Sequence, residues 1–126
     1  RIRSDCVNKI LIVEDEADIQ ALVHRVLTAN GFEVFKASNG EEGLIKALTL
    51  KPDLIILDLM MPGISGLEVC RLIKSRQDTK KTPVLILSAL NRSVDREYAK
   101  EAGADHYMSK PFQIDELLVA IDNLMT

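Results

Sequence analysis

The sequence predicts an α/β fold, namely a single doubly wound five-stranded parallel sheet with five helices. Apolar runs of strand length alternate five times with segments of helical spacing. This alternation implies parallel strands joined by helices that cover both faces of the sheet. Right-handed crossovers then restrict the topology and favour the strand order 2-1-3-4-5. The 126 residues are the size of one ordinary domain.

The first half of the chain supplies three of the strands and two of the helices. Strands are expected at Lys9–Val13, Glu33–Ala37 and Leu54–Leu57. The first helix should end at Asn30-Gly31, a usual C-terminal signal. The second helix is expected over Gly40–Leu50, and Gly43 inside it should cost about 1 kcal/mol relative to Ala. The first helix presents one apolar face, made of Ile19, Leu22, Val23, Val26 and Leu27.

The second half contains the remaining elements. Ser65 and Glu68 predict a capping box at the start of the third helix, which should end near Ser75. The fourth and fifth strands are expected at 83–87 and 106–108. The fourth helix, about 94–101, is polar and has little apolar face. The last helix has its apolar residues at clean helical spacing: Ile114, Leu117, Leu118, Ile121, Leu124 and Met125. We expect residues 1–8 to be a tail or linker and residues 9–126 to be the domain.

Composition narrows the class of protein. The net charge is −3 and no Lys/Arg block stands out, so this segment is not expected to bind nucleic acid. No apolar run approaches the roughly 18 residues of a membrane span, and no signal peptide is visible, so we expect no membrane insertion and a cytoplasmic location. Cys6 and Cys70 fit no metal spacing; Cys70 should be a buried thiol within a helix, and Cys6 lies in the tail.

Polar residues stand where four of the predicted strands end. Glu14 and Asp15 follow the first strand, and Asp58 follows the third. Ser88 follows the fourth strand and Lys110 comes just after the fifth. In a parallel sheet these positions converge on one edge, where such folds bind ligands. Carboxylates held close together are harder to ionise, so a cation is expected among them. Oxygen ligands favour Mg²⁺, and no His or Cys is placed for a softer metal.

The same residues suit phosphoryl transfer. A carboxylate can act as a nucleophile toward phosphorus, and the charge on the transferring oxygens must be neutralised. Mg²⁺, the Lys110 ammonium and the Ser88 hydroxyl, with nearby backbone N–H groups, could each take one of those oxygens. The predicted chemistry is therefore transfer of a phosphoryl group onto Asp58, followed by hydrolysis of the acyl phosphate.

Four spaced motifs carry a family resemblance. They are Val13-Glu14-Asp15, the run from Asp58 through Pro62-Gly63 to Gly66, Leu87-Ser88-Ala89, and Lys110-Pro111-Phe112. Together and in this order, they resemble the receiver domain of a two-component response regulator, in the CheY-like superfamily with its flavodoxin-like fold. The resemblance covers about residues 9–125. Because the strand order 2-1-3-4-5 is also that of the family, it is not independent support for the fold.

The resemblance implies a role for each matching residue. Asp58 would be the phosphoacceptor, assisted by Ser88 and Lys110. Mg²⁺, or Mn²⁺ in its place, would be held by Glu14, Asp15, Asp58 and the backbone carbonyl of Met60. Tyr107 would be the aromatic switch residue that turns inward when the Ser88 hydroxyl moves, although a plain edge aromatic is the alternative reading. The Lys110–Pro111 peptide bond would be cis.

The resemblance also implies partners. A histidine kinase or a histidine phosphotransfer protein would donate the phosphoryl group. A downstream output domain or protein would then recognise the face formed by the fourth helix, fifth strand and fifth helix. A phosphorylation-dependent homodimer through the fourth-helix face is a further possibility. Such a domain is not a conventional enzyme, because it catalyses its own phosphorylation and dephosphorylation at Asp58.

Three other functions fit the sequence less well. A phosphorylation-independent pseudo-receiver would be an interaction scaffold, but such domains usually lose an acidic ligand, the acceptor or the lysine. An aspartyl phosphatase would carry a second Asp two residues after the nucleophile, where this chain has Met60. A flavin carrier of the same fold would need a Ser/Thr-rich phosphate loop after the first strand, and none is seen.

Overall fold

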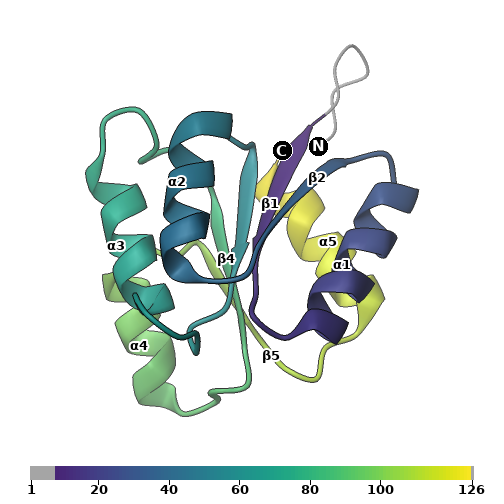
Figure 1. Ribbon diagram of the computed structural model, residues 1–126. Helices are drawn as coiled ribbons and strands as arrows, with labels where there is room; N and C mark the ends of the chain where they lie inside the picture. Colours follow the sequence, from purple (N-terminus) through teal and green to yellow (C-terminus); the bar gives the residue numbers. More distant parts are fainter. Residues whose placement is uncertain (1–7, 126) are drawn as a thin grey trace.

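The structure is a computed structural model that describes residues 8–125, and within that range five strands alternate with five helices (Figure 1). Most of the predicted tail, including Cys6, lies outside the described residues. The strands are β1 (Lys9–Val13), β2 (Glu33–Ala37), β3 (Leu54–Leu57), β4 (Val84–Ser88) and β5 (His106–Ser109). The helices are α1 (Ala17–Ala29), α2 (Gly40–Leu50), α3 (Gly66–Ser75), α4 (Ser93–Glu101) and α5 (Ile114–Leu124).

The five strands form one parallel sheet in the order β2-β1-β3-β4-β5, which confirms the predicted fold class. The register brings the carboxyl ends of the central strands level with one another. Val13 pairs with Leu57, so the residues that follow them, Glu14 and Asp58, leave neighbouring strands at the same edge. These two acidic residues are thereby brought together where the strand order reverses.

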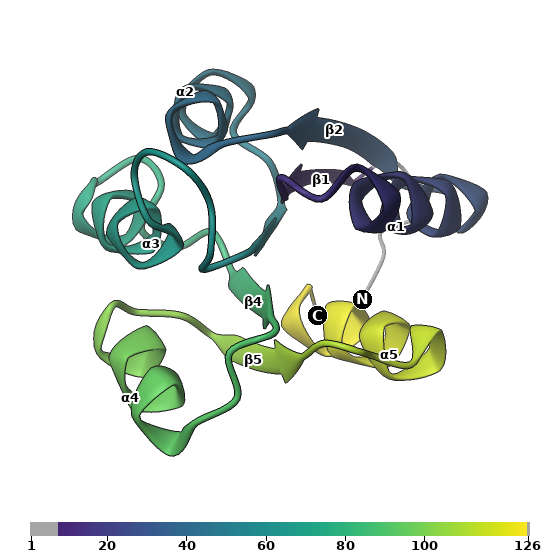
Figure 2. The ribbon, with the colours of Figure 1, turned by 60° about the horizontal axis from the view of Figure 1, so that its bottom comes forward.

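Helices cover both faces of the sheet. Figures 1 and 2 show α1 and α5 on one face and α2, α3 and α4 on the other. Two apolar clusters match these two layers, since alternate residues of each strand point to opposite faces. In β1, for example, Leu11 packs with the α2–α4 layer and Ile12 with the α1–α5 layer. All four residues of β3 are buried, as expected for a central parallel strand.

β2 is an edge strand and is only partly buried. Glu33 and Lys36 are exposed on it. The backbone carbonyl of Lys36 accepts a hydrogen bond from the Lys46 ammonium of α2 at 2.6 Å. A charged side chain therefore occupies a backbone acceptor at this edge of the sheet.

Several boundaries differ slightly from the predicted ones. β4 begins at Val84 and includes Ser88, which pairs with Ser109 and is the last residue of the strand. Only half of the predicted capping box forms at α3. Ser65 Oγ accepts from the Glu68 backbone N–H at 3.2 Å. The Glu68 carboxylate instead pairs with Arg71 one turn later, at 2.8 Å.

Gly43 has a packing role that its helix propensity does not reveal. A Cβ at this position would come within 2.7 Å of a Val13 methyl carbon. Glycine therefore lets α2 lie close to the end of β1, directly before Glu14. Among residues 8–125, no helix combines the length and apolar character needed to cross a membrane.

Candidate functional site

Asp58 lies at the centre of the carboxyl edge. It follows β3, is only 4% exposed, and its backbone N–H donates to the Val13 carbonyl at 3.0 Å. Its Oδ1 accepts from the Met60 backbone N–H at 3.2 Å. Its Oδ2 lies 3.5 Å from the Lys110 Nζ atom. The carboxylate is thus fixed by its own strand and loop, with one oxygen directed at a cation.

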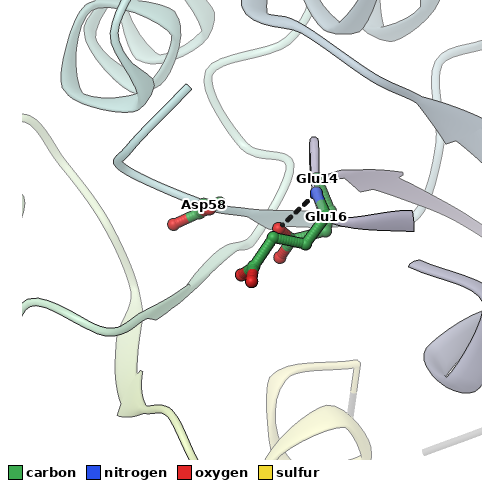
Figure 3. Close-up of side chains that lie close together, drawn as sticks. All are labelled: Glu14, Glu16 and Asp58. Carbon is green, nitrogen blue, oxygen red and sulfur yellow. Dashed lines mark hydrogen bonds between the residues drawn. The ribbon is translucent and has the colours of Figure 1, made fainter. Parts of the chain in front are cut away.

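Glu14 is the buried acidic residue at the end of β1. It is 2% exposed, and its backbone N–H donates to the Ala37 carbonyl at 3.0 Å. One carboxylate oxygen lies 2.8 Å from Lys110 Nζ. The other accepts from the Glu16 backbone N–H at 3.1 Å, drawn as a dashed line in Figure 3. Both oxygens of this buried carboxylate therefore have a donor.

Lys110 joins the acidic residues. Its side chain is 9% exposed, and the ammonium lies 2.8 Å from Glu14, 2.8 Å from Glu16 and 3.5 Å from Asp58. Its backbone N–H donates to the Ser88 carbonyl at 2.8 Å, which holds the lysine beside β4. The peptide bond that follows, Lys110–Pro111, is cis.

The electrostatics of the site reflect this crowding. Burial raises the pKa of Glu14 from 4.5 to about 7, although hydrogen bonds from Lys110 and the Glu16 N–H oppose the shift and the charge of Asp58 adds to it. Burial by itself would lower the pKa of Lys110, but hydrogen bonds to Glu14 and Glu16, together with the charge of Asp58, raise it above its usual range. The lysine is therefore a permanent cation among carboxylates.

The acidic residues that come together differ in part from the predicted set. Oxygens of Glu14, Glu16 and Asp58 lie within 4.8 Å of one another (Figure 3). Asp15 is exposed and lines the same open pocket, without joining this close group. Glu16 was not among the predicted residues. One signal in the sequence could have identified it: Glu16 is the third consecutive acidic residue after β1. In an extended chain alternate residues lie on the same side, so Glu16 is expected on the same side as Glu14.

The loop between β3 and α3 shapes the other wall of the pocket. The Met60 side chain is 55% exposed, and Met60, Ala89 and Asp58 line the cavity together with the charged residues. Gly66 begins α3 directly against Asp58, where a Cβ would come within 2.1 Å of the Asp58 carbonyl oxygen. The loop is also attached to α2, because the Ile64 N–H donates to the Glu41 carboxylate at 3.3 Å.

Ser88 and Tyr107 lie on the β4–β5 side. Ser88 is fully buried, and its hydroxyl oxygen accepts from the Leu90 backbone N–H at 3.2 Å. The Tyr107 hydroxyl donates to the Leu90 carbonyl, so both side chains are tied to the same residue of the β4–α4 loop. The Arg96 guanidinium of α4 stacks over the Tyr107 ring, 4.6 Å from its centroid. Burial raises the pKa of the Tyr107 phenol, which is therefore a hydrogen-bond donor at neutral pH.

Comparison with known proteins agrees with this fold and identifies the family. A sequence model of the response regulator receiver domain matches residues 10–122. The chain therefore belongs to the response regulator receiver domain family. The match includes all of the strands except the first residue of β1, and nearly all of the last helix.

Similar curated proteins are bacterial regulators. The chain is 46% identical over 109 residues to the alkaline phosphatase synthesis transcriptional regulatory protein PhoP of Bacillus subtilis, covering 86% of this chain and 45% of that protein. It is 44% identical over 115 residues to the response regulator ArlR of Staphylococcus aureus, covering 91% and 51%. The chain thus spans about half the length of these relatives.

Solved structures show the same arrangement. The chemotaxis protein CheY4 of Vibrio cholerae superposes with a TM-score of 0.89 at 31% identity, covering 94% of this chain and 99% of that chain. A signal receiver domain from a histidine kinase of Syntrophus aciditrophicus gives a TM-score of 0.88 at 31% identity, covering 94% and 90%. Similar domains therefore occur in proteins of different overall organisation.

Proposed function

We propose that this domain is a phosphorylation switch in which Asp58 accepts a phosphoryl group from a phosphohistidine of a partner protein. The observation that carries the proposal is the meeting of a buried aspartate and a buried glutamate with a lysine whose side chain is 9% exposed, at one sheet edge. A histidine kinase or a histidine phosphotransfer protein would be the donor, and the transfer would take place in the cytoplasm. Glu14, Asp15, Asp58 and Lys110 are all present, so a pseudo-receiver scaffold is not favoured.

The donor set of the site fits Mg²⁺, with Mn²⁺ as an alternative. The close group of Glu14, Glu16 and Asp58 consists only of carboxylate oxygens, and Asp15 lines the same pocket. Glu14, Asp15, Asp58 and the Met60 carbonyl would hold the ion. When bound, it would neutralise charge on the phosphoryl oxygens and on the carboxylates around them.

The residues of the chain then have distinct tasks. An Asp58 carboxylate oxygen attacks phosphorus while the bond from phosphorus to the imidazole nitrogen breaks, and the imidazole leaves with its electron pair. Lys110, 3.5 Å from Asp58 Oδ2, can donate to a phosphoryl oxygen. The buried Ser88 hydroxyl can donate to another. In the second half of the cycle, water attacks phosphorus while the bond from phosphorus to the Asp58 oxygen breaks. The Asp58 carboxylate leaves with its electron pair, and the proton lost by the water departs with inorganic phosphate or to solvent.

The switching surface would be the face of α4, β5 and α5. Tyr107 and Ser88 both contact Leu90. Movement of the Ser88 hydroxyl toward a phosphoryl group would therefore change the contacts of the tyrosine and of the loop that leads into α4. The face already exposes Tyr98 and Val119, which are 51% and 60% exposed. An output domain or protein, or a second phosphorylated copy, would bind there.

Phosphorylation can be tested with small donors. The domain is incubated with Mg²⁺ and acetyl phosphate or phosphoramidate, and intact mass is measured. We expect one added phosphoryl group in the wild-type protein and none in Asp58→Asn. The proposal fails if the wild-type protein gains no phosphate, or if Asp58→Asn still accepts it.

A further inference from the structure

The Lys110 ammonium has three N–H donors and three carboxylate neighbours. The contacts to Glu14 and Glu16 are short, at 2.8 Å each, and the contact to Asp58 is longer, at 3.5 Å. Two short contacts fix the direction of the ammonium group. The remaining donor then faces Asp58, where it is only weakly used.

The two short contacts come from carboxylates of very different exposure. The Glu14 side chain is 3% exposed and contacts the ammonium from the interior. The Glu16 side chain is 60% exposed and contacts it from the solvent side, whereas Lys110 itself is 9% exposed. Glu16 is therefore the solvent-exposed partner of an ammonium group that is itself little exposed.

The position of Glu16 in the fold provides an independent observation. Glu16 is the N-cap residue of α1, yet its side chain makes no capping hydrogen bond. Short side chains such as Ser, Asp or Asn are strongly preferred at this position because they reach the free N–H groups of the first turn. The longer glutamate extends to Lys110, 94 residues away in the chain. Its length thus serves the lysine contact and not the helix.

We propose that Glu16 is a positioning residue for phosphoryl transfer: it holds the Lys110 ammonium so that one N–H donor stays directed at the oxygens of a phosphoryl group on Asp58. This inference rests on the proposed function of Asp58. Glu16 would touch neither the phosphoryl group nor the nucleophile, and it acts through Lys110 alone.

Two substitutions of Glu16 change the length and the charge of its side chain separately. Glu16→Gln removes the charge and keeps the length. Glu16→Asp keeps the charge, shortens the side chain by one methylene and supplies α1 with a preferred cap. Asp18→Asn, in the first turn of α1, is the matched control because it removes one exposed carboxylate for which no contact with Lys110 is seen.

The first measurement is the rate of phosphorylation by phosphoramidate at saturating Mg²⁺. Loss of one charge-assisted hydrogen bond to the lysine should slow both Glu16 variants by about fivefold. The Asp18→Asn protein should stay within about twofold of wild type. Thermal unfolding should show that Glu16→Asp is as stable as wild type or more so, which excludes misfolding as the cause.

The second measurement needs neither metal nor phosphate. In metal-free protein, the ¹⁵N signal of the Lys110 ammonium reports how well its protons are shielded from exchange with water. Exchange should be faster in Glu16→Asp and Glu16→Gln and unchanged in Asp18→Asn.

The outcomes show whether the contact between Glu16 and Lys110 matters or only the negative charge near the site. Slower transfer and faster ammonium exchange in both Glu16 variants support the proposal. It is overturned if Glu16→Asp behaves like wild type, or if Asp18→Asn is slowed as much as the Glu16 variants. If wild-type protein takes up no phosphate, the proposed function fails by itself, while the exchange measurement still reports on the contact between Glu16 and Lys110.

Discussion

The two halves of the carboxyl edge are built differently. On the β1–β3 side, Glu14 and Asp58 are 2% and 4% exposed, and the backbone N–H of each donates to a neighbouring strand end. On the β4–β5 side, Tyr107 is half-buried and its hydroxyl is held by a loop carbonyl. The helix beside it, α4, buries only Asp95 and Ala99.

In the proposed function, this difference would separate phosphoryl transfer from the surface that a partner recognises. Carboxylates that receive a metal and a phosphoryl group need fixed positions, because small displacements weaken catalysis strongly. A surface that changes for a partner needs low local stability, which few buried apolar contacts provide. Lys110 connects the halves, since its ammonium lies among the carboxylates while its backbone N–H donates to Ser88.

The largest loss of stability should come from adding a side chain on the β1–β3 side of the carboxyl edge. In Gly66→Ala, the new Cβ would lie 2.1 Å from the Asp58 carbonyl oxygen, so α3 or the β3–α3 loop must move. We expect a loss of about 3 kcal/mol in the free energy of unfolding, measured by chemical denaturation.

Gly31→Ala provides the matched control. Gly31 has a φ of +92°, but an added methyl carbon would meet nothing within 4 Å, so only backbone strain of about 1 kcal/mol is expected. Equal losses in the two variants would show that the close approach of Gly66 to Asp58 is not what limits this region.

A second test uses pH to probe burial of Glu14. In the unfolded chain this acid loses its proton near its ordinary pKa of 4.5, but in the folded protein it keeps the proton up to about pH 7. The folded state therefore binds more protons across this window, and stability falls as pH rises through it. In metal-free protein the decrease due to Glu14 should be on the order of 2 kcal/mol.

Glu14→Gln isolates this contribution. The variant should lose the Glu14 part of the slope between pH 4.5 and 7. The raised pKa of Lys110 adds stability that is present throughout this window, because the lysine stays protonated well above it. Parallel stability profiles for the two proteins would contradict the assignment.

The smallest loss of stability should come from substitutions on the β4–β5 side of the carboxyl edge. Tyr107→Phe removes the hydroxyl that donates to Leu90 and keeps the ring under Arg96. We expect a loss of about 1 kcal/mol in unfolding free energy, together with faster amide exchange in the β4–α4 loop. Tyr98→Phe on the exposed face of α4 should change stability by less than about 0.5 kcal/mol. A loss for Tyr107→Phe as large as that for Gly66→Ala would contradict the contrast between the two halves.

The sequence predicts the fold and much of the site because both follow from where apolar runs end. Asp58, Glu14 and Ser88 each come at the end of such a run. Parallel strands place these residues at one edge of the sheet, and this does not depend on the conformation of the loops. Glu16 could not be identified in the same way, since its partner is 94 residues away and the contact depends on where Lys110 lies in space.

Packing against distant residues explains the other differences. Gly43 reads as an unfavourable residue in a helix, and only the position of Val13 shows why a side chain is excluded there. Likewise, Glu68 has two local partners, the helix start and Arg71, and sequence spacing alone does not decide between them. Asp15 stays a predicted metal ligand, at the rim of the pocket and outside the close group of carboxylates.

The edge strand β2 has a consequence for how the domain behaves at high concentration. An open sheet edge can template pairing with a strand of another molecule. Here the Lys36 carbonyl is already bonded to the Lys46 ammonium, and an incoming strand would have to displace that charge. Glu33 and Lys36 add charges of both signs along the same strand. The arrangement opposes pairing of this edge with a strand of a second molecule.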